Sequence, residues 1–223
     1  MSVKYVIARF NENITWLDDI SNDCIIYNKG EPLNIPNEIL RENVGRESDV
    51  YLHYIITNYN HLPDVVVFSQ AKLVDHYFRS DDIKHLTQLK DQAFYYDKSL
   101  PKVSHFTRTS DFFCWDPEWN FRELFYNKKE NYKHVKITFW DWFTKNVSEK
   151  YPNPIKIYHN AVFAVKKELI LQHPITYYEN LINQVNHHIN PMEGHFFERS
   201  WYYVFPSAKD ANYTTLDPSI LKN

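Results

Sequence analysis

The segment "DVVVFSQ" constrains the fold more than any other part of the chain, because Val65 to Phe68 is apolar at every position. A strand with one solvent-facing side alternates apolar and polar residues, whereas a strand covered on both faces is continuously apolar. The preceding residues change period and define one apolar face at helical spacing: Leu52, Ile55, Ile56, Tyr59 and Leu62. Together the two patterns predict a helix, ending near Pro63, that leads into a fully buried strand.

Two further strands are predicted before this helix. The segments "KYVIARF", Lys4 to Phe10, and "CIIYNKG", Cys24 to Gly30, are short apolar runs with β-branched residues. The segment "NITWLDDI" between them is long enough for a short helix, which favours a β-α-β unit with parallel strands. The proline-containing segment "EPLNIPNEI" that follows is expected to be a surface loop.

The second half of the chain is less regular, but it continues to mix the two element types. Helices are predicted over 81–96, 116–128, 136–147, 174–188 and 194–205, and strands over 102–106 and 155–165. The whole pattern predicts an α/β fold, a three-layer sandwich with a mainly parallel central sheet to which the later half adds an antiparallel strand. We expect a single catalytic-type domain over residues 1–206 and a C-terminal extension over 207–223.

Composition disfavours several classes of protein. The 25 Lys and Arg against 28 Asp and Glu give a net charge of -3, which argues against nucleic acid as a main partner. Three glycines cannot form the clustered fingerprint of a dinucleotide site or a P-loop. The two cysteines, Cys24 and Cys114, match neither a disulfide framework nor a zinc site. Without a secretory leader or a long apolar window, we expect a cytoplasmic protein with no membrane span.

Polar residues at the strand ends are the first candidate site residues, because ligands of open α/β sheets bind beyond the carboxyl ends of the strands. These candidates lie near or beyond the ends of the first three predicted strands or, for His159, within the last one, in chain order: Arg9, Asn11, Lys29, Asp75, His76 and His159. Cationic groups at such positions could hold a diphosphate. The same residues could also be solvated loop positions, so the pattern alone leaves both roles open.

The tripeptide Gly45-Arg46-Glu47 stands at the predicted start of a helix. Free backbone N–H groups and the helix dipole favour an anion there, and Arg46 could bind a phosphate in bidentate fashion. Alternatively, Asn43 or Gly45 caps the helix and Glu47 complements its dipole. The residues by themselves do not separate a phosphate site from a helix cap.

The segment "HINPMEGHFFERSWYYVF" carries the other candidate cluster. On a helix Glu198 and Trp201 lie three positions apart and share a face. A carboxylate beside an aromatic ring suits sugar binding and acid/base chemistry, since the ring packs on sugar C–H groups while the carboxylate takes a hydroxyl proton. The alternative is a core tryptophan next to a solvated glutamate.

Several motifs in order, "VIARFNENITWL", "IIYNKG", "NVGRESDVYLHYIITNYNHLPDVVVFSQ", "NAVFAVKKELILQHPITYYENL" and "EGHFFERSWYYVF", resemble an uncharacterised family of single-domain proteins from fungi, bacteria and large viruses. The resemblance covers most of the chain from Val6 to Phe205. The layout of that family is in turn similar to glycosyltransferases of the A-type fold. There the first strands hold the nucleotide, the third ends at the donor diphosphate, and an acidic residue on a later helix serves as base.

The resemblance implies an enzyme that moves a sugar from a nucleotide-sugar donor to a glycan or other hydroxyl acceptor. It assigns catalysis to Glu198, with Asp75 as second candidate for base or metal ligand. Donor binding falls to Arg9, Asn11, Lys29, Arg46 and Glu47, and substrate binding to His76, His159 and Trp201.

The chain departs from that fold's pattern where an Asp-x-Asp metal motif normally follows the third strand, because it has "FSQAKLVDH" instead. The Asp-x-Asp pair binds the divalent ion, Mn²⁺ or Mg²⁺, that neutralises the leaving diphosphate. Either Asp75 and His76 reach such an ion, or Arg9, Lys29 and Arg46 replace it. Two other functions stay open. One is a glycoside or phosphoester hydrolase that pairs Glu198 with Asp75 or Glu193, and the other is a noncatalytic carbohydrate-binding or interaction protein.

Overall fold

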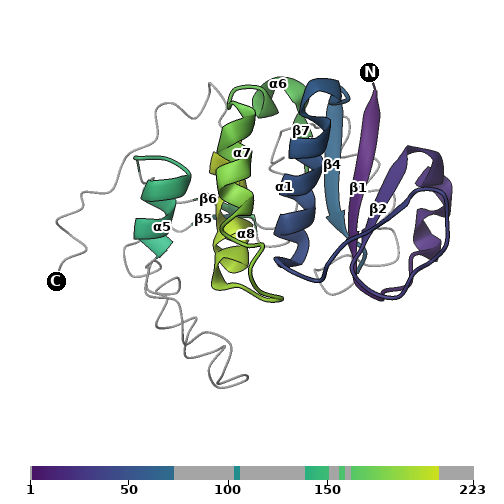
Figure 1. Ribbon diagram of the computed structural model, residues 1–223. Helices are drawn as coiled ribbons and strands as arrows, with labels where there is room; N and C mark the ends of the chain where they lie inside the picture. Colours follow the sequence, from purple (N-terminus) through teal and green to yellow (C-terminus); the bar gives the residue numbers. More distant parts are fainter. Residues whose placement is uncertain (1, 73–102, 106–138, 151–155, 159–161, 206–223) are drawn as a thin grey trace.

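The central sheet of this mixed α/β protein is open, with five strands in the order β3-β2-β1-β4-β7 (Figure 1). The computed structural model describes residues 2–72, 103–105, 139–150, 156–158 and 162–205. The strands of this sheet are β1 Val3–Arg9, β2 Cys24–Asn28, β3 Glu38–Leu40, β4 Val65–Gln70 and β7 Phe163–Lys166. Two short strands, β5 Val103–His105 and β6 Lys156–Tyr158, form a second sheet.

The pairing of the strands confirms a mainly parallel sheet with an antiparallel addition. β1 pairs in parallel with β2 on one side and with β4 on the other, so that Val6 lies opposite Ile25 and Phe68. β3 continues the parallel order beyond β2. β7 pairs with β4 in the antiparallel sense, with Val66 opposite Val165.

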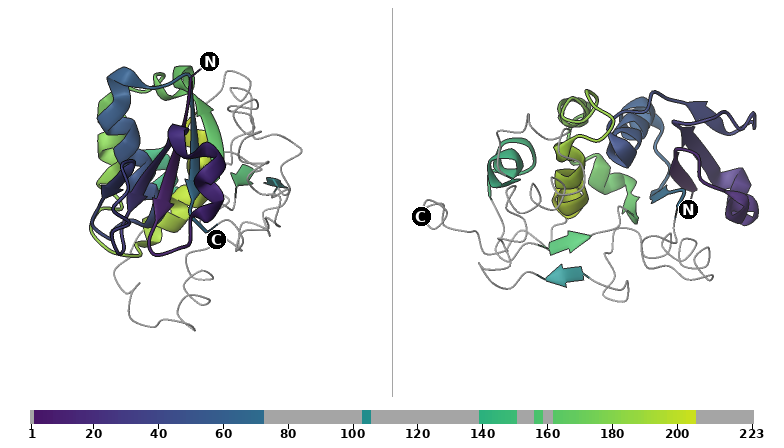
Figure 2. Two further views of the ribbon diagram at one scale, coloured as in Figure 1. Left: turned by 90° about the vertical axis from the view of Figure 1, so that its right-hand side faces the viewer. Right: turned by 90° about the horizontal axis from the view of Figure 1, so that it is seen from below.

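Helices and single turns connect and cover these strands. Their bounds are η1 Thr15–Asp23, α1 Arg46–Asn58, η2 Tyr59–His61, α5 Phe139–Asn146, α6 Lys167–Ile170, α7 Ile175–Ile182 and α8 Met192–Val204. Helix α1 lies over one face of the sheet and the 3-10 helix η1 over the other (Figure 2). Helices α7 and α8 pack beside α1.

Both faces of the sheet are buried, as the continuous apolar run predicts. In β4, Val66 and Phe68 belong to the core beneath α1, whereas Val65 and Val67 belong to the core beneath η1. All four side chains are almost fully buried, with at most 1% of their surface exposed. The sequence pattern of β4 therefore follows directly from its place inside the sheet.

Aromatic packing fixes α8 alongside α1. The ring of Tyr51 in α1 lies 4.7 Å from that of Phe68 and 5.8 Å from that of Trp201 in α8. Earlier in both helices, Arg46 contacts His195. The two contacts place the first turn of α8 beside the first turn of α1.

Four predicted elements differ from the structure. The first short helix is a 3-10 helix, and the proline-containing loop ends in the edge strand β3. The strand predicted over 155–165 is two strands, β6 and β7, which belong to different sheets. The helix predicted over 174–188 ends at Ile182, where turns follow. The helices predicted over 81–96 and 116–128 and the extension over 207–223 lie outside the described residues.

Candidate functional site

The carboxyl edge of the sheet carries the candidate site. The chain leaves β1 toward β2 on one side while β4 lies on the other, so the strand order reverses between β1 and β4, where α/β sheets commonly bind ligands. Helix α1 connects two parallel strands, β3 and β4, and therefore begins at this same edge. The first turn of α8 lies next to the first turn of α1, so the cluster described below stands at the edge that the fold favours.

Arg9 and Asn11, two predicted donor-binding residues, hold the loops that follow β1 and β2. The guanidinium of Arg9 donates from Nη1 to Asn28 Oδ1 at 2.8 Å and from Nε to the carbonyl of Glu12 at 2.9 Å. Asn11 Oδ1 accepts a hydrogen bond from the backbone N–H of Glu31 at 2.8 Å. In this state both side chains are engaged with the protein itself.

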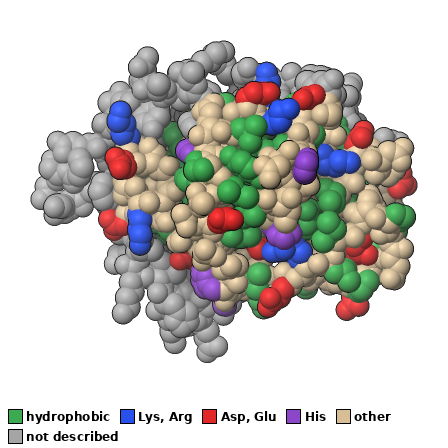
Figure 3. Space-filling view, turned by 45° about the horizontal axis from the view of Figure 1, so that its top comes forward, with side chains coloured by type: hydrophobic (Ala, Val, Ile, Leu, Met, Phe, Trp, Pro, Cys, Tyr) green, Lys and Arg blue, Asp and Glu red, His purple; other side chains and the backbone are tan. Residues whose placement is uncertain are grey.

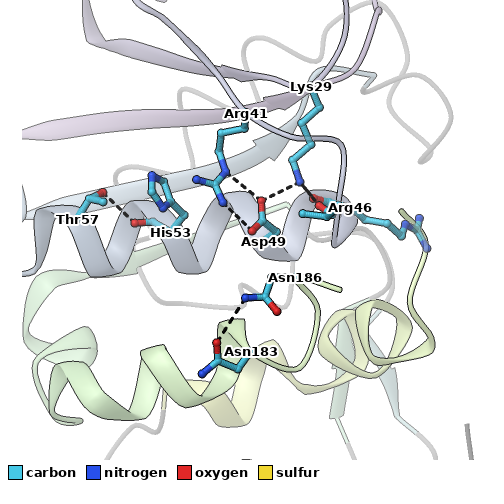
Figure 4. A network of polar contacts seen from close by, with 9 residues as sticks. Lys29, Arg41, Arg46, Asp49, His53, Thr57, Asn183 and Asn186 are labelled. Carbon is cyan, nitrogen blue, oxygen red and sulfur yellow. Dashed lines mark hydrogen bonds and ion pairs between the residues drawn. The ribbon is translucent and has the colours of Figure 1, made fainter. Parts of the chain in front are cut away.

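Lys29, another predicted donor-binding residue, is buried in a charge network under the start of α1 (Figure 4). Its Nζ lies 2.9 Å from Asp49 Oδ2, and Arg41 donates to both oxygens of the same carboxylate at 3.0 and 2.8 Å. Lys29 also donates to the carbonyls of Val44 and Arg46. Burial lowers the pKa of Lys29, and the charge of Asp49 opposes that change.

The backbone at the start of α1 is held in a conformation that few residues adopt. Gly45 has φ 66° and Arg46 has φ 53°, both in the left-handed region. A Cβ on Gly45 would meet Asp49 Cβ at 2.6 Å, which explains the glycine. For a non-glycine residue such a conformation costs about 1 to 3 kcal/mol and persists where the surroundings impose it. Here Lys29 Nζ donates a hydrogen bond to the backbone carbonyl of Arg46. The backbone carbonyl of His188 accepts one from the Gly45 N–H at 2.8 Å.

The Arg46 side chain is directed away from Asp49 (Figure 4). Its Nη1 lies 3.0 Å from Nδ1 of His195, and its side chain passes beside Gly194, where an added Cβ would be 3.5 Å from Arg46 Cδ. Burial, reinforced by the charges of Arg46 and Arg199, lowers the pKa of His195 to about 3. His195 is therefore neutral at physiological pH and can accept a hydrogen bond from the guanidinium.

Glu198 is the described residue with the clearest acid/base character. Its side chain is 18% exposed and lies 3.7 Å from Arg199 Nη1. Burial raises the pKa of Glu198 to about 7, the Glu47 carboxylate raises it further, and Arg199 and Arg46 act in the opposite direction. A carboxyl with such a pKa exchanges protons readily near neutral pH.

Arg46 lies 3.6 Å from Glu47, the charges of both act on Glu198, and Trp201 lies in the core. Trp201 is fully buried and packs on Phe163 and Phe197 as well as on Tyr51. Its ring thus supports the helix that carries Glu198 from below.

Three predicted site residues, Asp75, His76 and His159, lie outside the described residues. Within the part of the chain that the structure describes, no group of three or more His, Cys, Asp or Glu residues could hold a metal ion. If a metal ion neutralises the leaving diphosphate, residues outside the described part, such as Asp75, would have to contribute to binding it. Otherwise Arg9, Lys29 and Arg46 would supply the positive charge.

Sequence reasoning missed the roles of Asp49, His195 and Arg199. Asp49 looks like any acidic residue in a first helical turn, although it is fully buried. Arg46 and His195 are separated by 149 positions, so their contact has no local signature. The only available signal was the density of charged residues around Gly194.

Charged side chains of both signs are intermixed across one face of the molecule, together with histidines and apolar groups (Figure 3). No helix of the described residues is long and apolar enough to cross a membrane.

The model of a family described as "Protein of unknown function (DUF3431)" matches residues 5–216. The chain belongs to this family. Searches of curated proteins and of solved structures each found no match.

Proposed function

We propose that the chain is a glycosyltransferase with a three-layer, nucleotide-sugar-transferase-like fold, which moves a sugar from a nucleotide-sugar donor to a hydroxyl acceptor. One observation carries the proposal. The largely buried carboxyl of Glu198 has a pKa near 7, lies 3.7 Å from Arg199 Nη1 and is acted on by the charge of Arg46. Such a group combines a base suited to neutral pH with positive charge for a phosphate leaving group.

In the proposed reaction, Glu198 accepts the proton of the acceptor hydroxyl. The hydroxyl oxygen attacks the anomeric carbon of the donor sugar, and the bond from that carbon to the diphosphate breaks with inversion. The nucleoside diphosphate leaves with the electron pair. Arg46, whose side chain is 30% exposed, is the guanidinium best able to meet the developing negative charge.

The hydrogen bonds of Arg9, Lys29 and Arg46 support different roles for these three cations. Arg9 and Lys29 have their donors engaged by backbone carbonyls and by Asn28 or Asp49. We assign them to holding the donor-side loops, and Arg46 to the diphosphate. A divalent ion bound by Asp75 would share that charge, and the assay below separates the two cases.

The test is a screen of nucleotide sugars with the full chain. Release of nucleoside diphosphate is measured with manganese, with magnesium and with EDTA, and donor binding is measured by calorimetry. We expect at least one donor to bind and turn over, with a rate that rises with pH through about 7 as Glu198 becomes ionised. Glu198→Gln should lower turnover about 100-fold or more while donor binding persists.

Two further variants sharpen this test. Arg46→Ala should weaken binding of the nucleoside diphosphate about tenfold or more, because it removes a charge-assisted contact. Glu179→Gln, the same chemical change on the exposed face of α7, should behave as the wild type. If no donor binds and none is turned over under any metal condition, the proposal fails.

A second candidate function is hydrolysis of a glycosidic or phosphoester bond. It is favoured by one observation, that the charge of Glu47 acts on Glu198 and raises its pKa, as in pairs of catalytic carboxyls. Glu47 would then take the partner role for which Asp75 or Glu193 was expected. A hydrolase would cleave aryl glycosides or aryl phosphates without a nucleotide donor, and Glu47→Gln would abolish that cleavage.

A further inference from the structure

One oxygen of the Glu47 carboxylate has no hydrogen-bond partner within the described part of the chain. The side chain is only 7% exposed, and its Oε2 lies 3.6 Å from Arg46 Nε. Its Oε1 is buried and accepts no hydrogen bond from the described residues. The hydroxyl of Ser48, the next residue in the chain, is also buried without a hydrogen-bond partner there. A carboxylate oxygen is a strong acceptor, and burying one without a donor is costly.

The unsatisfied oxygen belongs to the site and not to the distant core. Glu47 lies in the first turn of α1, pairs with Arg46, and acts electrostatically on Glu198 of the neighbouring helix. In the first turn of that helix, Glu193 Oε2 is a second buried acceptor without a partner in the described residues. The site therefore holds two buried acceptors without a partner among the described residues, and two buried donors in the same condition, Ser48 Oγ and Trp201 Nε1, lie on the same two helices.

A bound molecule that satisfies these oxygens must bring O–H or N–H groups. An acidic acceptor would bring few donors to these two oxygens and would place a further negative charge beside Glu47 and Glu193. A neutral sugar brings several hydroxyls at fixed separation, and two adjacent hydroxyls can reach two neighbouring carboxylates at once.

Building on the proposed glycosyltransferase activity, we propose that Glu47 contacts the acceptor. Its Oε1 accepts a hydrogen bond from the hydroxyl adjacent to the one that Glu198 deprotonates. The acceptor is accordingly a vicinal diol of a neutral sugar, and Glu47 selects for the second hydroxyl. Its other oxygen keeps Arg46 in position, so one side chain connects the acceptor with the cation assigned to the diphosphate.

The experiment measures binding separately from turnover. Methyl glycosides of glucose, galactose, mannose and xylose, and the mono-deoxy analogues of each, are titrated into the wild-type chain and followed by saturation-transfer NMR. The same titrations are made with Glu47→Gln and with the exposed control Glu179→Gln. Thermal unfolding of each variant confirms that it is folded, and calorimetry with nucleoside diphosphates reports on the Arg46 side of the site.

We expect at least one glycoside to bind the wild type at least tenfold more tightly than one of its deoxy analogues, because a hydrogen bond to a charged group is lost. Glu47→Gln should remove that preference, and Glu179→Gln should keep it. If the deoxy analogues bind as well as the parent glycosides, or if Glu47→Gln alters only nucleoside diphosphate binding, Glu47 merely holds Arg46 and the inference is overturned.

The outcome is distinguishable from failure of the proposed function. A Glu47-dependent preference for a diol without turnover of any nucleotide sugar would refute the transferase and retain the sugar contact. Sugar transfer with unchanged selectivity in Glu47→Gln would retain the transferase and refute the contact.

Discussion

Replacing Glu198 by glutamine should stabilise the protein, and only above a certain pH. Folding raises the pKa of this carboxyl from an ordinary value of 4.5 to about 7. Below pH 4.5 the group is protonated in both the folded and unfolded states. As the pH rises toward 7, the unfolded chain releases the proton while the folded protein retains it, so the free energy of unfolding of the wild type falls.

The size of this effect follows from the same two values. A tenfold change in an ionisation equilibrium corresponds to about 1.4 kcal/mol, so the change in pKa from 4.5 to about 7 amounts to about 3 kcal/mol. Glutamine resembles the protonated carboxyl and does not ionise. The stability of Glu198→Gln relative to the wild type should therefore increase by up to about 3 kcal/mol between pH 4.5 and pH 8.

Urea unfolding followed by tryptophan fluorescence at pH 4.5, 6, 7 and 8 measures this difference directly. Comparing two pH values cancels any fixed effect of the amide, and Glu179→Gln controls for the loss of an exposed carboxylate. A difference between wild type and Glu198→Gln that stays constant with pH, or that shrinks as the pH rises, would refute the argument. The variant should also be inactive, so the expected gain in stability accompanies a loss of function.

Two further predictions concern the start of α1. Gly45→Ala should lower the free energy of unfolding by about 2 kcal/mol or more, because φ is 66° and the new Cβ would lie 2.6 Å from Asp49 Cβ. Gly194→Ala is the matched control and should be tolerated, because its Cβ would lie 3.5 Å from the nearest neighbouring atom. Asp49→Asn should lower it by about 3 kcal/mol in urea unfolding, because Lys29 and Arg41 lose their shared buried counter-charge, and Lys29→Met in that background should recover part of the loss. Equal stability of the two alanine variants, or an unchanged Asp49→Asn protein, would contradict the roles assigned here.

Local patterns were sufficient for the sheet wherever burial alone determines the residue types. The apolar run of β4 requires cover on both faces, and the helical spacing before it requires a helix between parallel strands. β3 was missed because it forms by pairing with β2 and through side-chain contacts, not through its own local pattern. Glu38 lies opposite Ile26 of β2, and its carboxylate accepts hydrogen bonds from Leu33 N–H and Asn28 Nδ2. No local propensity of a proline-containing segment reveals such contacts.

The candidate site was predictable in its residue types but not in its connections. Glu198 stood out because a carboxylate near a tryptophan on one helical face is chemically informative. The sequence could not indicate that Lys29 and Arg41 would meet on Asp49 and not on a ligand, since a cation at a strand end has the same appearance in both cases. The unusual backbone of Arg46 likewise depends on Lys29 and on the contacts around Gly45.

The antiparallel pairing of β4 with β7 also bears on how the protein is made. The first four strands are complete once Gln70 has been synthesised, whereas β7 begins at Phe163. At ordinary translation rates of about 5 to 20 residues per second, the free edge of the most apolar strand waits for roughly 5 to 20 s on the ribosome. An edge strand without its partner invites pairing with other chains, so we expect that slower translation between Gln70 and Phe163 increases aggregation of the nascent protein.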